Sequence, residues 1–363
     1  MSSDISDLRK PGLTIHDVAK MAGVSAKTVS RVVNDEAGVS HEKRALIARI
    51  ISEVGYYPHT GARSMRKPCR DSVGVTFPAP VEQSPLSQQF LLWLFAEIYR
   101  LFCKDGGFVC FDLNPFAKNR DEDYARGLWQ QRYGACIVAG PLAVNDTTAH
   151  RIQASGHPYL AMGRLDSLPD ISCATVDYEE AAYLSAKYLI DKGHKRIAML
   201  RAFEGYQPGV ERLRGYLRAL EEAEIPFDEN LVRPVTFDAL HLASVTHRLL
   251  LDPTVTALIE CSGSEDAASV REGARRAGRV PGQDFDVVVW TYTDNAAVLN
   301  EAAAHIWLPA REAAAEGLEL LADWVQERRT DPIKVIYRPT LYHPSTDREI
   351  PKPKPLFDVL LNR

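Results

Sequence analysis

The N-terminal part of the chain carries hydrophobic residues at helical spacing in three short groups. The first group occupies one face of a helix and consists of Ile15, Val18, Ala19 and Ala22. Thr14 precedes this group and Asp17 follows three residues later, which is the spacing of a capping box. Gly23 suits the left-handed residue that ends a helix. The pattern therefore predicts a first helix over residues 15–22.

A second helix is expected from Ala26 to Asn34, with Ser25 as its N-cap. Only Val24 separates this cap from Gly23, and so short a joint with a glycine is typical of a helix-turn-helix. The buried face consists of Val29, Val32 and Val33, and the opposite face of Ala26, Lys27, Ser30 and Arg31. The opposite face suits base edges in a DNA groove. The alternative is a solvated face on a small core helix.

A third helix is expected after Ser40, which serves as its cap, and Gly55 ends it. Its hydrophobic stripe consists of Leu46, Ile47, Ile50, Ile51 and Val54. Three short helices with apolar faces of this kind predict a compact unit with its own core.

From Ser72 onward, short apolar runs alternate with helical stretches. The expected strands are 73–77, 107–111, 135–139 and 158–162, then 196–200, 256–261 and 286–290. The expected helices are 87–104, 121–132 and 145–155, then 178–192, 210–223, 240–251, 264–278 and 296–304. Such alternation predicts parallel sheets with helices on both faces. The fold class is therefore multidomain, with an α head and a two-lobed α/β body.

Charge is distributed unevenly along the 363 residues, although the formal net charge is only -5. Residues 1–70 contain twelve Lys and Arg against seven Asp and Glu, a net +5, which leaves -10 for the rest. A basic head on an acidic body favours a nucleic-acid partner for the head.

The six cysteines are scattered without a CxxC pair, which fits neither a disulfide framework nor a zinc site. No long apolar run predicts a membrane span or a secretory signal. We therefore expect a cytoplasmic, nucleoid-associated protein with no membrane partner, no metal and no cofactor.

Residues 14–67 resemble the DNA-binding head of the LacI family of bacterial repressors. The matching features are TIHDVAKMAGVSAKTVSRVVN, the spacing to Val39-Ser40, the GYYP that ends the third helix, and the later ARSM. The resemblance implies a two-lobed body like the periplasmic binding proteins. It divides the chain into a head (1–57), a hinge (58–70), an effector-binding and dimerisation body (71–345) and a tail (346–363). The lobes are expected near 71–170 and 174–304, with the C-terminal part crossing between them.

The resemblance also implies which residues of the head contact DNA. Ala26, Lys27 and Arg31 would read bases, and the two cations favour the acceptor atoms of guanine. The residues that would contact phosphates or fix the register are Thr14, Ser25, Thr28, Ser30 and Asn34.

In the family the hinge forms a helix on DNA and inserts a leucine into the minor groove. Here Met65 takes that position, next to Ala62 in the ARSM motif. Methionine is more flexible than leucine, and Gly61 lowers helix propensity, so we expect a hinge that melts easily. The alternative is that 58–68 is merely a linker.

A small-molecule site is implied in the body. The family's R-x-x-G-Y pattern appears as Arg212 to Tyr216, and its first arginine grips the effector. Thr291 aligns with the family's usual ligand-binding carboxylate, so the effector is expected to differ in charge or size. Aromatic residues that could stack on a ligand are Phe203, Tyr206, Trp290 and Tyr292; each could equally be core. Arg212 could alternatively be a surface arginine.

These observations predict a sequence-specific transcriptional regulator, most simply a repressor. It would act as a homodimer on double-stranded operator DNA, under allosteric control by a small molecule, a carbohydrate or derivative by family habit. No catalytic motif is present, so we do not expect an enzyme and assign no catalytic residue. The rivals are a sugar-binding or sugar-processing enzyme fused to a DNA-binding head, and a non-specific architectural DNA binder.

Overall fold

The protein is described from a computed structural model that comprises two compact units, Met1–Pro68 and Cys69–Arg363. The described residues are 14–33, 36–54, 72–78, 88–103, 107–112, 123–202, 204–236, 238–262, 267–292, 301–329 and 331–343. The expected hinge (58–70) and the expected tail (346–363) lie outside them. None of the described helices is both long and apolar enough to cross a membrane.

The N-terminal unit, here called the head, contains α1 (Ile15–Ala22), α2 (Ala26–Val33) and α3 (His41–Val54). All three helices were expected from the sequence. Their core consists of Val18, Ala19, Val29, Ile47 and Val54. Leu46 was expected in the apolar stripe but is 39% exposed, whereas Ile47 of the same stripe is completely buried as expected.

The second unit, here called the body, contains two six-stranded sheets. The first sheet has the order β11-β5-β4-β3-β1-β2, and all its neighbours are parallel. Its strands are β1 (Ser72–Thr76), β2 (Phe108–Asp112), β3 (Ala135–Val138), β4 (Tyr159–Ala161), β5 (Cys173–Val176) and β11 (Lys334–Tyr337). We call this sheet and its covering helices the first lobe.

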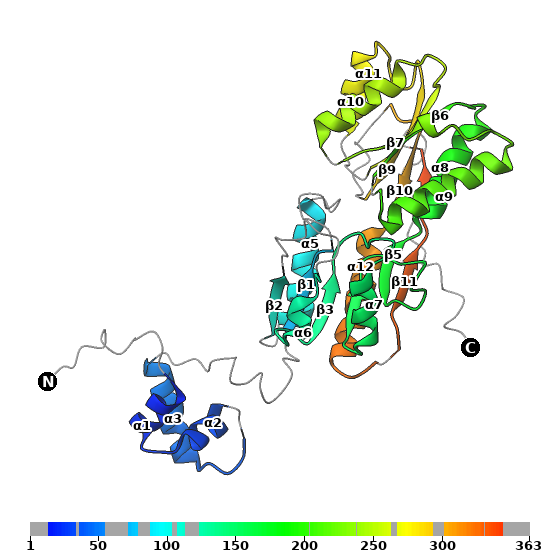
Figure 1. The fold of residues 1–363 in the computed structure, drawn as a ribbon. Helices are drawn as coiled ribbons and strands as arrows, with labels where there is room; N and C mark the ends of the chain where they lie inside the picture. The colour runs from blue at the N-terminus through cyan, green and yellow to red at the C-terminus, as the bar shows by residue number, and fades with distance from the viewer. Residues whose placement is uncertain are drawn as a thin grey trace. The chain divides into compact units, whose positions relative to one another are not determined.

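Helices cover both faces of the first sheet (Figure 1). They are α5 (Gln88–Ile98), which continues as a short π-helix (Tyr99–Cys103), α6 (Arg126–Trp129), α7 (Thr147–Ala154) and α12 (Ala310–Val325). The helices α5 and α12 pack into one hydrophobic cluster and α6 and α7 into another, on the opposite face. The first lobe is thus a three-layer α/β unit, as the alternating pattern predicted.

The second lobe is built around the sheet β12-β10-β9-β8-β6-β7, in which only the β10–β12 pair is antiparallel. Its strands are β6 (Ile197–Arg201), β7 (Val232–Pro234), β8 (Ala257–Cys261), β9 (Asp286–Thr291), β10 (Ala304–Trp307) and β12 (Thr340–Tyr342). One face packs against α8 (Tyr178–Asp191) and α9 (Gln207–Glu222), the other against α10 (Ala239–Leu250) and α11 (Ala267–Arg276) (Figure 1). A short 3-10 helix (Glu229–Leu231) precedes β7.

The chain crosses between the lobes three times. It leaves the first sheet after β5, returns after β10 to form α12 and β11, and crosses again to add β12 to the second sheet. Consequently the carboxyl ends of β5 and β9 both lie where the lobes meet. In open α/β sheets this is the edge where ligands bind.

Candidate functional site

Two sets of hydrogen bonds cap the helices of the head as the sequence predicted. The backbone N–H and the hydroxyl of Thr14 both donate to Asp17 Oδ2, at 2.8 and 2.7 Å. These bonds hold the pKa of Asp17 below its ordinary value. Gly23 ends α1 at φ 62° and ψ 32°, in the left-handed region. Ser25 Oγ accepts the backbone N–H of Thr28 at 3.2 Å and so caps α2.

The helix α2 separates its apolar face from its polar face. Val29 is completely buried in the core of the head, whereas Lys27 is exposed and Arg31 is half-buried. Lys27 and Arg31 are four residues apart, which places both cations on one side of the helix. Ala26 and Ser30 have the same spacing. The arrangement presents Ala26 and Lys27 in the first turn of α2, and Ser30 and Arg31 one turn further on, with Arg31 in the last turn.

Four residues of the expected sites fall outside the described part of the chain. They are Asn34, Ala62, Met65 and Phe203. Their expected roles remain predictions.

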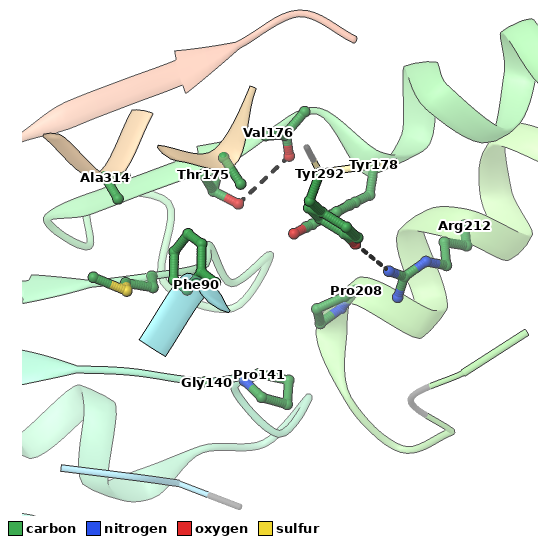
Figure 2. A pocket seen from close by; sticks show the side chains of 13 residues that line it. Phe90, Gly140, Pro141, Thr175, Val176, Tyr178, Pro208, Arg212, Tyr292 and Ala314 are labelled. Carbon is green, nitrogen blue, oxygen red and sulfur yellow. Dashed lines mark hydrogen bonds between the residues drawn. The ribbon is translucent and has the colours of Figure 1, made fainter. Parts of the chain in front are cut away.

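The body contains a cavity between its two lobes (Figure 2). Its empty volume is about 730 Å³, which includes space open to solvent. The lining residues are Phe90, Gly140, Pro141, Met162, Ala174, Thr175, Val176, Tyr178, Pro208, Arg212, Tyr292, Ala310 and Ala314. Small-molecule sites combine apolar walls with a few polar groups, as this lining does.

Arg212 is the permanent charge among these lining residues. Its side chain extends from α9 and is only 1% exposed. The guanidinium carbon lies 4.8 Å from the ring centre of Tyr178 and 5.1 Å from that of Trp290. Nη2 donates to the hydroxyl of Tyr292 at 3.4 Å (Figure 2). Aromatic faces and a phenol oxygen therefore position this cation at the cavity wall.

Three other expected effector residues, Tyr206, Trp290 and Thr291, are not among the lining residues. Trp290 and Thr291 are completely buried at the end of β9. The indole N–H of Trp290 donates to Ser185 Oγ at 2.9 Å, which fixes the ring beneath Arg212. Tyr206 forms an isolated bridge with Ala143 and packs against the core on the α10 side. Trp290 thus supports the cavity from behind.

Tyr178 lines the cavity although the sequence did not single it out, and Tyr292 was named only as a possible stacking residue. Tyr292 directly follows the carboxyl end of β9, and Tyr178 follows Asp177, the N-cap of α8, just after β5. Beyond the end of a strand, side chains no longer alternate between the two faces of the sheet. A position just after the carboxyl end of a predicted strand was therefore the feature of the sequence that could have identified both residues. Burial raises the pKa of both phenols, so both hydroxyls stay protonated and can donate hydrogen bonds.

A cluster of charges joins the lobes beside the cavity. Arg164, which follows β4 in the first lobe, donates to Glu211 of α9 at 2.8 Å and to Asp177 at 3.0 Å. Glu211 is 2% exposed, and burial raises its pKa although Arg164 opposes the shift. The backbone N–H of Gln207 also donates to Leu142 O, across the lobes, at 2.9 Å. The helix that carries Arg212 is therefore tied directly to the first lobe.

Two family models match the chain. The model described as "Bacterial regulatory proteins, lacI family" matches residues 14–59. The model described as "Periplasmic binding proteins and sugar binding domain of LacI family" matches residues 103–318, which is more than half of the chain.

Individual relatives are similar over most of the chain. The "HTH-type transcriptional repressor PurR" of Yersinia pestis (strain Pestoides F) is 26% identical over 345 residues, covering 90% of this chain and 95% of the relative. A structure of the "transcriptional regulator CelR-cellobiose complex" is 25% identical with a TM-score of 0.60, covering 92% of this chain and 98% of that one. The "lac repressor dimer bound to operator and the anti-inducer ONPF" is 22% identical with a TM-score of 0.69 and the same coverage, and shows the shared fold.

Proposed function

Because the chain belongs to the LacI family of bacterial regulatory proteins, whose members are DNA-binding repressors with a ligand-binding domain, we propose how its own residues perform that function. The head reads an operator through α2, and a small molecule in the inter-lobe cavity sets the affinity of that reading. The observation that carries the proposal is the polar face of α2, with Lys27 exposed and Val29 completely buried beneath it. A relative solved as a dimer on operator DNA supports a homodimer on a near-palindromic site.

In this proposal α2 enters the major groove with its N-terminal end toward the bases. Lys27 and Arg31 donate to the O6 and N7 atoms of guanine, and Ala26 offers a methyl contact. Thr14, Ser25, Thr28, Ser30 and Asn34 contact phosphates or fix the register, which orients the helix without reading sequence. Ala62 and Met65 approach the minor groove, where an apolar side chain can part a base step.

The ligand acts through the difference in its affinity for two arrangements of the lobes. The cavity is lined from both lobes, so a bound molecule contacts Val176 of β5 and Arg212 of α9 together. The arrangement of the lobes in which the ligand contacts both Val176 and Arg212 more favourably is stabilised when the ligand binds. By linkage, operator and ligand then alter each other's affinity by the same factor.

We further propose that the protein is not an enzyme and that it acts in the cytoplasm, at the nucleoid. Its relatives are named as transcriptional regulators, which supports this assignment. Incubation of the full chain with a panel of mono- and disaccharides tests it. Reproducible product formation, lost in an Arg212→Met variant, would contradict the assignment.

Selection of binding sites from random duplex DNA tests the proposed function directly. The full chain is expected to enrich a near-palindromic sequence and to bind it about 10³-fold or more tightly than scrambled DNA at physiological salt. Equal affinity for both sequences would indicate a non-specific architectural binder instead.

A further inference from the structure

We infer that the effector of this protein is an organic anion, a carboxylate on a flat or compact apolar body, rather than a neutral polyol. The inference rests on the proposed function, because it takes the inter-lobe cavity as the effector site. The inference follows from the side chains that line the cavity and from the contacts that each of them already makes.

The first observation is a buried cation at the cavity wall. Arg212 is 1% exposed, its guanidinium carbon lies 4.8 Å from the ring centre of Tyr178 and 5.1 Å from that of Trp290, and it reaches the cavity beside Tyr292 (Figure 2). A guanidinium interacts most strongly with a planar oxyanion, to which it can donate two parallel hydrogen bonds. In an enclosed site such a charged pair is much stronger than the same pair in water.

The second observation is that the neighbours of Arg212 are donors. The Tyr178 and Tyr292 hydroxyls stay protonated because burial raises the pKa of each. The two hydroxyls hydrogen-bond to each other, so one of the two phenol protons is left to donate to a ligand. A phenol can donate to a carboxylate oxygen, whose lone pairs accept up to four bonds. Together with the Arg212 guanidinium, which contacts Tyr292 at 3.4 Å, these groups form one cluster of donors on the second-lobe side of the cavity.

The third observation concerns the remaining walls. Phe90, Met162 and Val176 line the first-lobe side, and Pro208 lines the second-lobe side. Among the described lining residues, Thr175 has the one polar side chain besides Tyr178, Arg212 and Tyr292, and its hydroxyl already donates to the Val176 carbonyl at 3.4 Å. A polyol would therefore place several hydroxyls against carbon, and each unpaired hydroxyl opposes binding. An apolar ring or chain gains from the same walls.

The fourth observation is the charge balance of the lining. Within the part of the chain that the structure describes, the lining residues include one arginine and no carboxylate. Carboxylates are the groups that accept pairs of sugar hydroxyls. Thr291, at the position where the resemblance places such a group, is completely buried and outside the lining. The described lining is thus cationic and hydrophobic, which matches an acid with an apolar body.

Thermal shift and calorimetry on the full chain test the inference with paired probes. The acids are benzoate, phenylacetate and cyclohexanecarboxylate, and each is compared with its neutral primary amide. Glucose, ribose and cellobiose form the neutral polyol set. Bound ligand raises the melting temperature in proportion to RT ln(1 + [L]/Kd), so millimolar affinities are detectable.

Three variants locate the effect. Arg212→Met removes the charge while keeping an unbranched side chain, and Arg212→Lys keeps the charge without the planar fork. Tyr292→Phe removes one hydroxyl. Arg214→Met is the matched control, because Arg214 lies on the same helix but is 45% exposed and pairs with Asp166 and Glu179.

We expect at least one acid to stabilise the chain, with its amide and the sugars weaker. Loss of a hydrogen bond to a charged group predicts binding about 10- to 100-fold weaker in Arg212→Met, and a smaller loss in Arg212→Lys and Tyr292→Phe. Arg214→Met should bind as the unaltered chain does. No stabilisation by any acid, tighter binding of a neutral sugar, or equal binding of the acids by Arg212→Met would each overturn the inference. The selection of binding sites from random DNA tests the proposed function without any of these ligands. A failure of the anion inference can therefore be distinguished from a failure of the proposed function.

Discussion

The cation proposed to read DNA bases at the start of α2 and the cation at the inter-lobe cavity lie in different environments. Lys27 on α2 is exposed and Arg31 is half-buried, and both belong to a unit whose described core residues are aliphatic. In the body, Arg212 is 1% exposed, and Arg164 pairs with a glutamate that is 2% exposed. Cations of the same type therefore have different consequences for stability in the two units.

The difference follows from the size and charge of each partner. DNA is a long polyanion that brings its charges to the protein surface, so the head needs no preformed pocket for its cations. A small molecule supplies few contacts, so its site must exclude water for those contacts to be strong. We therefore expect substitutions of exposed cations to change binding alone, and substitutions of buried ones to change folding as well.

The largest expected effect comes from Arg164→Met. This change leaves Glu211 buried without its cation, and breaking such a pair destabilises by about 3–5 kcal/mol. Arg214→Met is the control, because the ion pairs of Arg214 are exposed and worth at most about 1 kcal/mol. Denaturant unfolding of the full chain measures both. Similar losses in the free energy of unfolding for the two variants would show that buried and exposed cations contribute equally to stability.

The next largest effect is expected in the core of the head. Val29→Ala removes buried carbon from a completely enclosed site and should destabilise the head by about 2 kcal/mol. Met21→Ala, at a side chain that is 47% exposed, should change stability by less than about 0.5 kcal/mol. Amide hydrogen exchange in α1 to α3 reports the two effects. A head unaffected by Val29→Ala would show that Val29 contributes little to its core.

Arg31→Ala should act on recognition alone. Loss of a base contact predicts about 1–3 kcal/mol less discrimination at one position in each half-site, with unchanged thermal stability. Arg49→Ala is the matched control, since Arg49 lies on α3 and its ion pair with Glu53, at 3.4 Å, is exposed. Binding to a set of single-base operator variants is the measurement. Equal weakening on every sequence would identify Arg31 as a phosphate contact.

Acid should loosen the first helix of the head slightly. The hydrogen bonds from Thr14 hold the pKa of Asp17 below its ordinary value of 3.8. The cap is therefore fully stabilising above that value and is lost as the pH falls through the lowered pKa. Circular dichroism at neutral pH and at about pH 3 should show a smaller acid-induced loss in Asp17→Asn, whose cap does not titrate. The same acid response in both proteins would place the titration elsewhere.

Met65→Leu should produce the smallest change, a modest tightening of operator binding. Leucine is stiffer than methionine and should stabilise the minor-groove wedge implied by the family resemblance. Ligand affinity should not change. Unchanged or weaker DNA binding would argue against an easily melted hinge.

The sequence allowed prediction of the head and of the alternating body because both depend on local patterns. Helical spacing and the caps at Thr14 and Ser25 define α1 and α2 within a few neighbouring residues. The three crossings of the chain between the lobes were harder to predict from the sequence. Strand β11 joins the first sheet beside β5, although about 160 residues separate them, and no local pattern encodes that pairing.

The cavity shows the same limit at the scale of single residues. Arg212 could be selected from its motif, but the alternation of β9 decides which of its neighbours face the ligand. Trp290 and Thr291 still belong to the strand and are buried on its two faces, whereas Tyr292 follows the strand and lines the cavity. A shift of one residue reverses the direction of a side chain, so alignment to a family pattern alone was insufficient.

Occupancy of the inter-lobe cavity is expected to control the affinity of the head for operator DNA. The most direct test is to measure the operator affinity of the full chain with and without a saturating ligand from the thermal-shift panel. We expect operator affinity to change by about 5- to 150-fold, matched by an equal change in ligand affinity when operator is bound. A cavity that is fully occupied while operator affinity stays the same would contradict it.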